Sequence, residues 1–254
     1  MTPTPEHLST AGARVADEPT EQEAAAHVQA MFDGIAPSYD RLNHILSVGL
    51  DRYWWTRAAR TFASVLSRPE ARVVDLCCGT GDMTAALLAL RPKVPEAVPV
   101  TGVDFASEML RRARKKHAGG DAIFLEADAL HLPFAEGTVD LVTAAFGFRN
   151  LASYADGLRE LCRVLRAGGE IGILEANQPG GLVGLGYNLY FHHVLPRLGG
   201  ALSGDHAAYR YLPASVARFP RPPRMLAMMQ EAGFREVSWT GYSLCTVGLF
   251  RGRK

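Results

Sequence analysis

The chain has 254 residues, is 48% apolar and carries a net charge of +1, which is enough apolar content for one well-buried domain. The near-neutral charge argues against the broad positive field that nucleic-acid binding uses, so we expect no nucleic-acid partner. Its four cysteines lack the spacing of a zinc site or a disulfide framework, and no apolar run is long enough to span a bilayer. With no features of a signal peptide, the sequence predicts a cytoplasmic protein without a bound metal.

Residues 1–20 lack aliphatic periodicity, and we expect a disordered tail there, followed by a single domain over residues 21–254. Residues 21–66 have the apolar spacing of helices and are expected to form an N-terminal helical cap. Strand-like runs then alternate with helical stretches, a pattern that predicts an α/β fold with a mostly parallel sheet covered by helices on both faces. The seven expected strands are residues 72–76, 98–103, 122–125, 139–146, 170–175, 236–240 and 244–251.

Helical stretches between these strands have polar starts or glycine stops. They are expected at residues 82–90, 107–116, 154–165 and 223–232. Residues 178–224 do not fit the alternation, because they are first apolar and Gly-rich and then Pro-rich. We expect this late segment to form an insertion or a lid.

The stretch from Val73 to Met83, VVDLCCGTGDM, carries the first functional signal. An apolar strand ends there in Asp75, and the loop after it contains Gly79, Thr80 and Gly81 before a helix begins. Glycines at such a turn let a ligand approach the backbone and allow positive φ. The loop therefore predicts a nucleotide or cofactor site, although Gly-x-Gly after a strand is also a common tight turn.

Acidic residues also follow the next two strands. Asp104 ends the second strand at the spacing of a ribose-binding carboxylate, and Asp128 with Ala129 follows the third. Thr84 stands where the dinucleotide fingerprint has its third glycine, and no P-loop lysine follows, which disfavours NAD and ATP. S-adenosylmethionine, which has adenosine but no phosphate, fits these features.

In this interpretation Asp104 accepts hydrogen bonds from the ribose hydroxyls, and the Gly79–Gly81 backbone passes the methionine portion. Asp128 with Ala129 then reaches the adenine amine, while the alternative for Asp128 is a turn-capping acid. Because strand ends of an open α/β sheet meet at one crevice, Asp75 and residues 146–150 are expected to line it as well.

Longer motifs extend along the chain from Val28 to Arg253. The most specific are YDRLNHILSVGLDRYW from Tyr39 to Trp54, FGFRN from Phe146 to Asn150, and YRYLPASV from Tyr209 to Val216. These motifs resemble the menaquinone and ubiquinone biosynthesis C-methyltransferase family. The resemblance implies a class I, Rossmann-like methyltransferase that uses S-adenosylmethionine to methylate a ring carbon of a polyprenylated quinol, most simply demethylmenaquinol, at the membrane surface.

The reaction that the resemblance implies needs a nucleophilic ring. A phenol ionises near pH 10, so a group that stabilises the phenolate raises the electron density of the ring carbon. Arg149 in FGFRN is the first candidate, because it follows the fourth strand and can stabilise an oxyanion or order a water. Such a water, with Asn150, Tyr39 or His193 nearby, is the expected proton acceptor. The alternative for Arg149 is a salt bridge that braces the loop.

Departures from the family pattern keep other interpretations open. Ala145 stands where some relatives carry a cofactor-binding serine, so the contact of that hydroxyl is not assigned to Ala145. The alternatives are a ubiquinone-pathway quinol, another small aromatic metabolite as substrate, or a non-catalytic cofactor-binding subunit. The apolar residues 182–202 are expected to receive the prenyl chain, touch the membrane or pack as a lid. The sequence leaves open whether the chain forms a homodimer.

Overall fold

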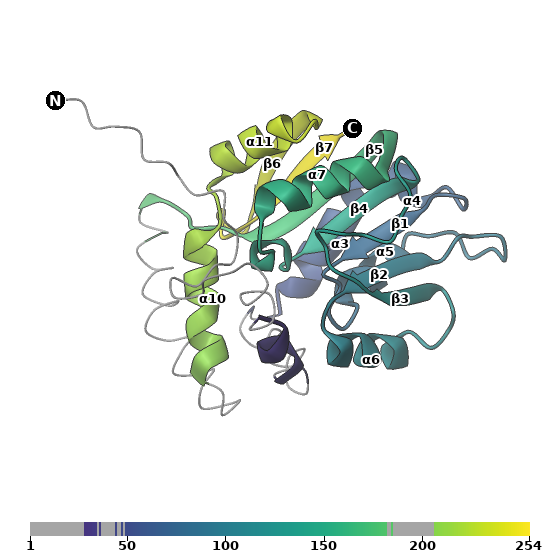
Figure 1. The fold of residues 1–254 in the computed structure, drawn as a ribbon, viewed down its shortest axis with the longest axis horizontal. Coiled ribbons are helices and arrows are strands. Elements are labelled where there is room, and N and C mark those ends of the chain that lie inside the picture. The colour runs from purple at the N-terminus through teal and green to yellow at the C-terminus, as the bar shows by residue number, and fades with distance from the viewer. Residues whose placement is uncertain are drawn as a thin grey trace.

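A computed structural model describes residues 28–34, 36, 44, 47, 49–181, 184 and 206–254, with the backbone alone for residues 206–210 and 212. A seven-stranded sheet runs through this part of the chain in the order β3-β2-β1-β4-β5-β7-β6 (Figure 1). The first five strands pair in parallel, and β7 is antiparallel to both β5 and β6. The strands are β1 Val73–Leu76, β2 Val100–Asp104, β3 Ala122–Glu126, β4 Val139–Ala145, β5 Leu165–Ala176, β6 Arg235–Tyr242 and β7 Val247–Arg253.

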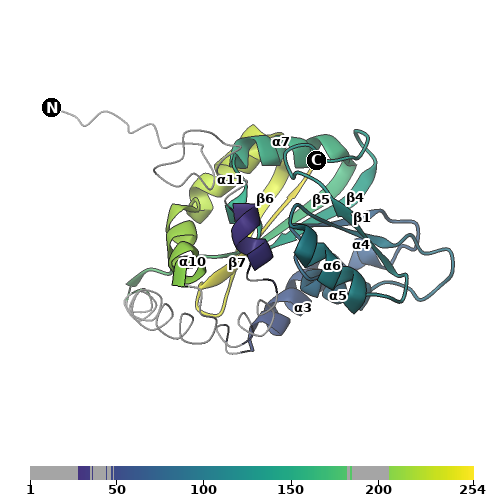
Figure 2. The ribbon, with the colours of Figure 1, turned by 60° about the horizontal axis from the view of Figure 1, so that its bottom comes forward.

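Helices cover both faces of the sheet (Figures 1 and 2). Successive strand residues point to opposite faces, so Val73 packs in the cluster that contains Phe62, whereas Val74 packs in the cluster that contains Leu158. This arrangement confirms the expected α/β class with a mostly parallel sheet. The helices are α3 Asp51–Thr61, α4 Ala63–Leu66, α5 Asp82–Leu88, α6 Ser107–Lys116, α7 Tyr154–Val164, α10 His206–Arg218 and α11 Pro222–Glu231, with a 3-10 turn, η1, at Phe148–Asn150.

The connection pattern puts a crevice at one edge of the sheet. After β1 the chain builds outward through β2 and β3, and from β4 onward it builds in the other direction. Loops therefore diverge between the carboxyl ends of β1 and β4, which is where open α/β sheets bind ligands. The helical segment 28–34 lies beside this edge, because Gln29 Nε2 donates to the Phe105 carbonyl at 2.6 Å and Asp33 Oδ1 accepts from the Glu108 amide at 3.1 Å.

Three elements differ by three residues or more from what we expected, and the first is β5, which begins at Leu165 rather than at residue 170. Strand β7 begins at Val247 rather than at residue 244, because Ser243, Leu244 and Cys245 take φ values of 45°, 57° and 64° and form a turn. Helix α10 lies within the expected insertion, where we expected no helix, and it contains Pro213. The tail at 1–20, residues 37–43 of the cap and residues 185–205 of the insertion lie outside the described residues, so the domain organisation stays a prediction.

Candidate functional site

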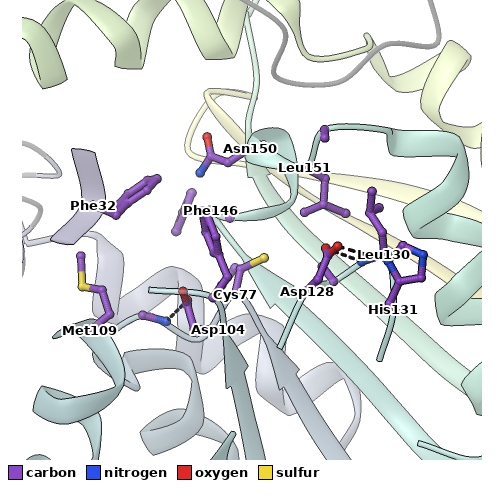
Figure 3. A pocket seen from close by; sticks show the side chains of 16 residues that line it. Phe32, Cys77, Asp104, Met109, Asp128, Leu130, His131, Phe146, Asn150 and Leu151 are labelled. Carbon is purple, nitrogen blue, oxygen red and sulfur yellow. Dashed lines mark hydrogen bonds and ion pairs between the residues drawn. The ribbon is translucent and has the colours of Figure 1, made fainter. Parts of the chain in front are cut away.

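A cavity of about 260 Å³ lies at the carboxyl ends of β1 to β4 (Figure 3). Each of these four strands or the loop after it contributes to the lining. The polar and backbone part of the lining includes Cys77, Gly79, Asp104, Asp128, Ala129, Ala145, Gly147 and Asn150. The apolar part includes Phe32, Phe105, Met109, Leu130, Phe146 and Leu151. The cavity is therefore a mainly apolar site with a few convergent polar groups, as small-molecule sites usually are.

The glycine loop after β1 turns through the left-handed region at three positions. Cys77, Gly79 and Gly81 have φ values of 51°, 54° and 88°. A Cβ atom at Gly81 would also lie 2.7 Å from His117 Nε2, so only glycine fits there. Gly79 enters the cavity lining, and its amide donates to Asp104 Oδ2 at 2.8 Å. The loop thus both approaches the ligand space and holds the acidic residue of β2.

Asp104 lies in the wall of the cavity with only 7% of its surface exposed. Besides the Gly79 amide, the Ala106 amide donates to its Oδ1 at 3.0 Å. Burial raises the pKa of Asp104, while these backbone hydrogen bonds act in the opposite direction. A carboxylate has about four acceptor positions, so it retains capacity to accept hydrogen bonds from a ligand.

Asp128 and Ala129 line the same cavity after β3. Asp128 Oδ1 accepts from the Leu130 amide at 2.9 Å, and its Oδ2 lies 3.2 Å from His131 Nδ1. The side chain is 61% exposed. Asp128 therefore caps its own turn and still faces the ligand space, so both interpretations of this residue describe part of its geometry.

Asp75 lies beneath the loop rather than in the lining. Its carboxylate is fully buried and accepts hydrogen bonds from the Thr84 hydroxyl at 2.6 Å and from the Thr143 hydroxyl at 3.2 Å. Burial raises the pKa of Asp75 to about 7. The residue joins β1 to α5 and β4, and its contacts are with the protein.

Arg149 is also behind the lining, in a buried ion pair. Its Nη1 lies 2.8 Å from Glu175 Oε2, with both side chains buried, and it also donates to the Phe146 carbonyl. The Arg149 amide donates to Glu175 Oε1 at 3.1 Å, and the Tyr154 hydroxyl donates to the Arg149 carbonyl at 2.9 Å. These contacts fix the FGFRN loop from the side away from the cavity, which is the bracing role weighed above for Arg149.

The ends of this braced loop face the ligand space. Gly147 passes so close to β1 that a Cβ atom there would lie 2.3 Å from Cys77 Cβ. Asn150 lines the cavity, and its Oδ1 accepts from the Tyr211 hydroxyl of α10 at 3.0 Å. With Oδ1 engaged, the amide nitrogen of Asn150 is turned toward the cavity (Figure 3). The pocket thus has a side-chain hydrogen-bond donor in addition to its two acids.

A family model described as the ubiE/COQ5 methyltransferase family matches residues 20–254. The chain belongs to this family. The match covers nearly the whole sequence and confirms the family that the motifs resemble. Membership confirms the enzyme class expected from the sequence, a methyltransferase whose cofactor is S-adenosylmethionine.

Two relatives are similar to this ubiE/COQ5 family member over most of each chain. The chain is 45% identical to the demethylmenaquinone methyltransferase of Deinococcus radiodurans, over 90% of this chain and 92% of that protein. It is 48% identical to the demethylmenaquinone methyltransferase of Thermus thermophilus, over 86% of this chain and 96% of that protein.

A solved structure extends the comparison to the fold. A SAM-dependent methyltransferase from Thermotoga maritima aligns with a TM-score of 0.62 at 19% identity, over 89% of this chain and 99% of that one. At this identity the likeness concerns the fold alone. It agrees with the sheet order and helix layers described above.

The residues expected at the site of this ubiE/COQ5 family member divide into three groups. Gly79, Asp104, Asp128, Ala129 and Asn150 line the cavity. Outside the lining are Asp75, Thr80, Gly81 and Arg149, and Tyr39 and His193 are outside the described residues. The assigned roles of all of them stay predictions.

Sequence reasoning missed two kinds of site residue. Phe105 and Met109 form apolar wall directly after Asp104, and an apolar residue in that position also fits an ordinary core. Glu175 was counted only as the end of a strand, although its position at the same edge as the other strand-end acids was a usable signal.

Proposed function

We propose that the chain transfers the methyl group of S-adenosylmethionine to a ring carbon of a demethylated polyprenyl quinol, with demethylmenaquinol as the substrate. The names of the two relatives support this acceptor, at 45% and 48% identity over most of each chain. The structural observation that supports the proposal best is the cavity itself, because two acidic groups, Asp104 and Asp128, and the Asn150 amide all line it.

The lining fits S-adenosylmethionine by its chemistry. Asp104 has acceptor capacity beyond its two backbone partners, which suits a pair of ribose hydroxyls. Met109, Phe105 and Leu130 offer apolar surface for a flat heterocycle, and the Gly79 backbone leaves room for the amino-acid portion. The chemistry that the cofactor supplies is an electrophilic methyl group on a positively charged sulfur.

Asn150, in the same lining, is the residue that we place against the quinol oxygen. A hydrogen bond from its Nδ2 to that oxygen favours the phenolate over the phenol and so increases electron density at the neighbouring ring carbon. Tyr211 holds the amide by donating to Oδ1 at 3.0 Å, which fixes the nitrogen in the orientation needed. A water beside Asn150 is the proposed proton acceptor, and Tyr39, which lies outside the described residues, stays the candidate from the sequence for a second partner of this water.

Arg149 acts in this proposal as a positioning residue. Its guanidinium is paired with Glu175 at 2.8 Å and holds the Phe146 carbonyl, so it fixes the backbone between Phe146 and Asn150. A misplacement of about 1 Å in an aligned methyl transfer costs a large part of the rate. The pair therefore supports catalysis through the loop rather than through contact with the ring.

The same proposal places the protein in the cytoplasm, at the inner face of the membrane that holds its substrate. A prenyl chain keeps the quinol in the bilayer, so the enzyme has to meet the ring at that surface. Among the described residues no helix combines the length and apolar character needed to cross a bilayer.

The test uses purified protein and methyl-labelled S-adenosylmethionine with two acceptors, demethylmenaquinol and a demethylated ubiquinol precursor. We expect label in the first acceptor at a rate at least tenfold above the second. Preferential labelling of the ubiquinol precursor would replace the proposed substrate by the ubiquinone-pathway alternative. Label in neither acceptor would contradict the proposed function.

A further inference from the structure

Large apolar side chains are exposed at one place beside the cavity. Leu244 is 76% exposed, Tyr53 48% and Leu50 44%, and together we call them the rim patch. The two other exposed large apolar residues of the described chain are Val94 and Ile123. Single exposed apolar residues are normal on protein surfaces, but a cluster of three requires an explanation.

Contacts between α3 and the turn from β6 to β7 bring the rim patch together. Trp54, next to Tyr53, donates from Nε1 to the hydroxyl of Ser243, next to Leu244, at 2.8 Å. Arg57 lies over the rings of both Tyr53 and Tyr242, at 5.9 Å and 4.5 Å from their centres. Leu50 is one helical turn before Tyr53 on the same side of α3.

The turn holds Leu244 outward in a fixed conformation. Three successive residues without glycine, Ser243 to Cys245, take left-handed φ values of 45°, 57° and 64°. Such a run persists only where surrounding contacts maintain it. Asn177 Nδ2 donates to the Cys245 carbonyl at 2.8 Å, and the Thr246 hydroxyl donates to the Ser243 carbonyl at 2.9 Å. An apolar side chain is therefore maintained in water at the tip of a braced turn.

Positive charge surrounds the rim patch. The exposed side of α3 carries Arg52, Arg57 and Arg60. The one acidic residue of this helix, Asp51, is buried, and its Oδ1 lies 3.0 Å from His44 Nδ1. Apolar and aromatic side chains flanked by arginines are the composition of surfaces that bind an anionic membrane interface.

The rim patch lies at the edge of the sheet where the cavity opens. Ala176 at the end of β5 pairs with Val247, so the turn at 243–246 is at the carboxyl edge of the parallel strands. Trp54 contacts Ser243 on one side, and its ring lies 5.9 Å from the ring of Phe146, which lines the cavity. A surface that contacts the rim patch is thus next to the catalytic space.

We propose that the rim patch and the arginines of α3 form a docking surface for an anionic lipid bilayer. This inference rests on the proposed function, because a quinol with a prenyl tail has to be taken from a bilayer. Docking at this edge brings the cavity to the interface where the quinol ring lies. Apolar side chains enter the boundary between headgroups and acyl chains, while the arginines bind the anionic headgroups.

Vesicle flotation tests the surface without use of the reaction. The probes are vesicles of phosphatidylcholine with phosphatidylglycerol and vesicles of phosphatidylcholine alone. We expect wild type to float with the anionic vesicles, and to float less at high salt. The double variant Leu244→Glu with Tyr53→Glu should remain in solution.

The arginines are tested one at a time. Replacement of Arg52 by Gln, or of Arg60 by Gln, should lower the partition coefficient by about fivefold each. The matched control is Ile123→Glu, which changes an apolar residue as exposed as Tyr53, on β3, the edge strand opposite β6, and leaves flotation unchanged.

A second measurement separates this inference from the proposed function. Methylation of a short-tailed, water-soluble quinol should proceed at the wild-type rate in the Leu244→Glu variant, whereas methylation of a quinol embedded in vesicles should fall at least fivefold. If wild type methylates no quinol, the proposed function fails and flotation still decides the docking surface. Three results would overturn the inference. The first is that wild type does not float, and the second is that Leu244→Glu and Ile123→Glu lose flotation equally. The third is that wild type is a dimer which Leu244→Glu dissociates without any effect on flotation.

Discussion

The carboxylate of Asp104 is held by amides from two segments, the loop after β1 and the start of α6. Both oxygens are oriented before any ligand binds, so little order has to be gained when a ribose arrives. Asp128 is different, because its carboxylate is mostly exposed and its partners belong to its own turn. The two acids should therefore contribute unequally to binding.

Replacement of Asp104 by Asn should weaken S-adenosylmethionine binding by about 10-fold to 100-fold, the cost of losing hydrogen bonds to a charged acceptor. The amide nitrogen that replaces one oxygen is a donor, so it accepts neither from a backbone amide nor from a ribose hydroxyl. Calorimetric titration measures the dissociation constant, and Asp128→Asn serves as the matched control, with an effect under tenfold. Equal losses in the two variants would refute the unequal roles.

Arg149 and Glu175 form a buried ion pair, which is the second feature of single residues that can be tested. Removal of either partner alone leaves a buried charge without its counter-ion, which costs about 3–5 kcal/mol of unfolding free energy. We expect Arg149→Met and Glu175→Leu each to show this loss in urea unfolding. The double variant should regain most of the stability, because an apolar pair of similar volume is tolerated.

Turnover of the double variant distinguishes positioning from stability. The Phe146 carbonyl and the Arg149 amide lose their side-chain partners in it, so kcat should stay at least tenfold below wild type while cofactor affinity changes little. Wild-type kcat in a stable double variant would show that the pair has a structural role alone.

At the scale of elements, Asp75 joins β1 to α5 and β4 through the hydroxyls of Thr84 and Thr143. Its pKa is raised to about 7 by burial, above the unfolded value near 3.9. The folded chain therefore retains a proton that the unfolded chain has lost between these pH values. By linkage, this residue lowers the unfolding free energy as pH rises from about 4 to about 7.

The Asp75→Asn variant should lack this dependence. Relative to wild type it should gain up to roughly 4 kcal/mol of stability at about pH 8 and nothing at about pH 4. Urea unfolding of both proteins at the two pH values gives the difference in unfolding free energy between variant and wild type. The contributions of the other titrating groups are the same in both proteins and cancel in this difference. If wild type instead became more stable than the variant toward about pH 8, the raised pKa of Asp75 would be contradicted.

The sequence predicted elements well where a local pattern decides them. Helix α6 has the expected bounds, because its apolar spacing and charged exposed side are local features. The start of β7 was placed too early, since the left-handed turn at Ser243 to Cys245 has no glycine to announce it. Helix α10 was missed because Pro213 disfavours a helix interior, and there the surrounding structure outweighs local propensity.

The site was predicted only in part, because the sequence shows which residues end the strands but not which side chains they contact. Strand ends identified Asp104 and Asp128 as facing one crevice, since the edge of a parallel sheet is implied by the alternation of elements. The sequence could not tell that Asp75 points into the core, or that Arg149, in the turn after β4, pairs with Glu175 of β5. Such pairings depend on register, which one sequence does not show.

In the molecule as a whole, three features share one edge of the sheet: the residues that we expect to bind the cofactor, the braced FGFRN loop, and the rim patch on α3 and the β6 to β7 turn. Trp54 lies between the rim patch and Phe146 of the cavity, so the proposed route from bilayer to cavity is short. This arrangement fits our proposal that the protein takes one ligand from solution and the other from a membrane.

The central claim is that this cavity methylates a ring carbon of a lipid quinol. The most direct measurement is the carbon-13 NMR spectrum of the product formed from demethylmenaquinol and S-adenosylmethionine with a carbon-13 methyl group. We predict a single labelled resonance at the shift of a methyl group on an aromatic carbon, reduced with the Asp104→Asn variant at low cofactor concentration. A labelled resonance at the shift of a methoxy group, or the absence of labelled product, would contradict the account.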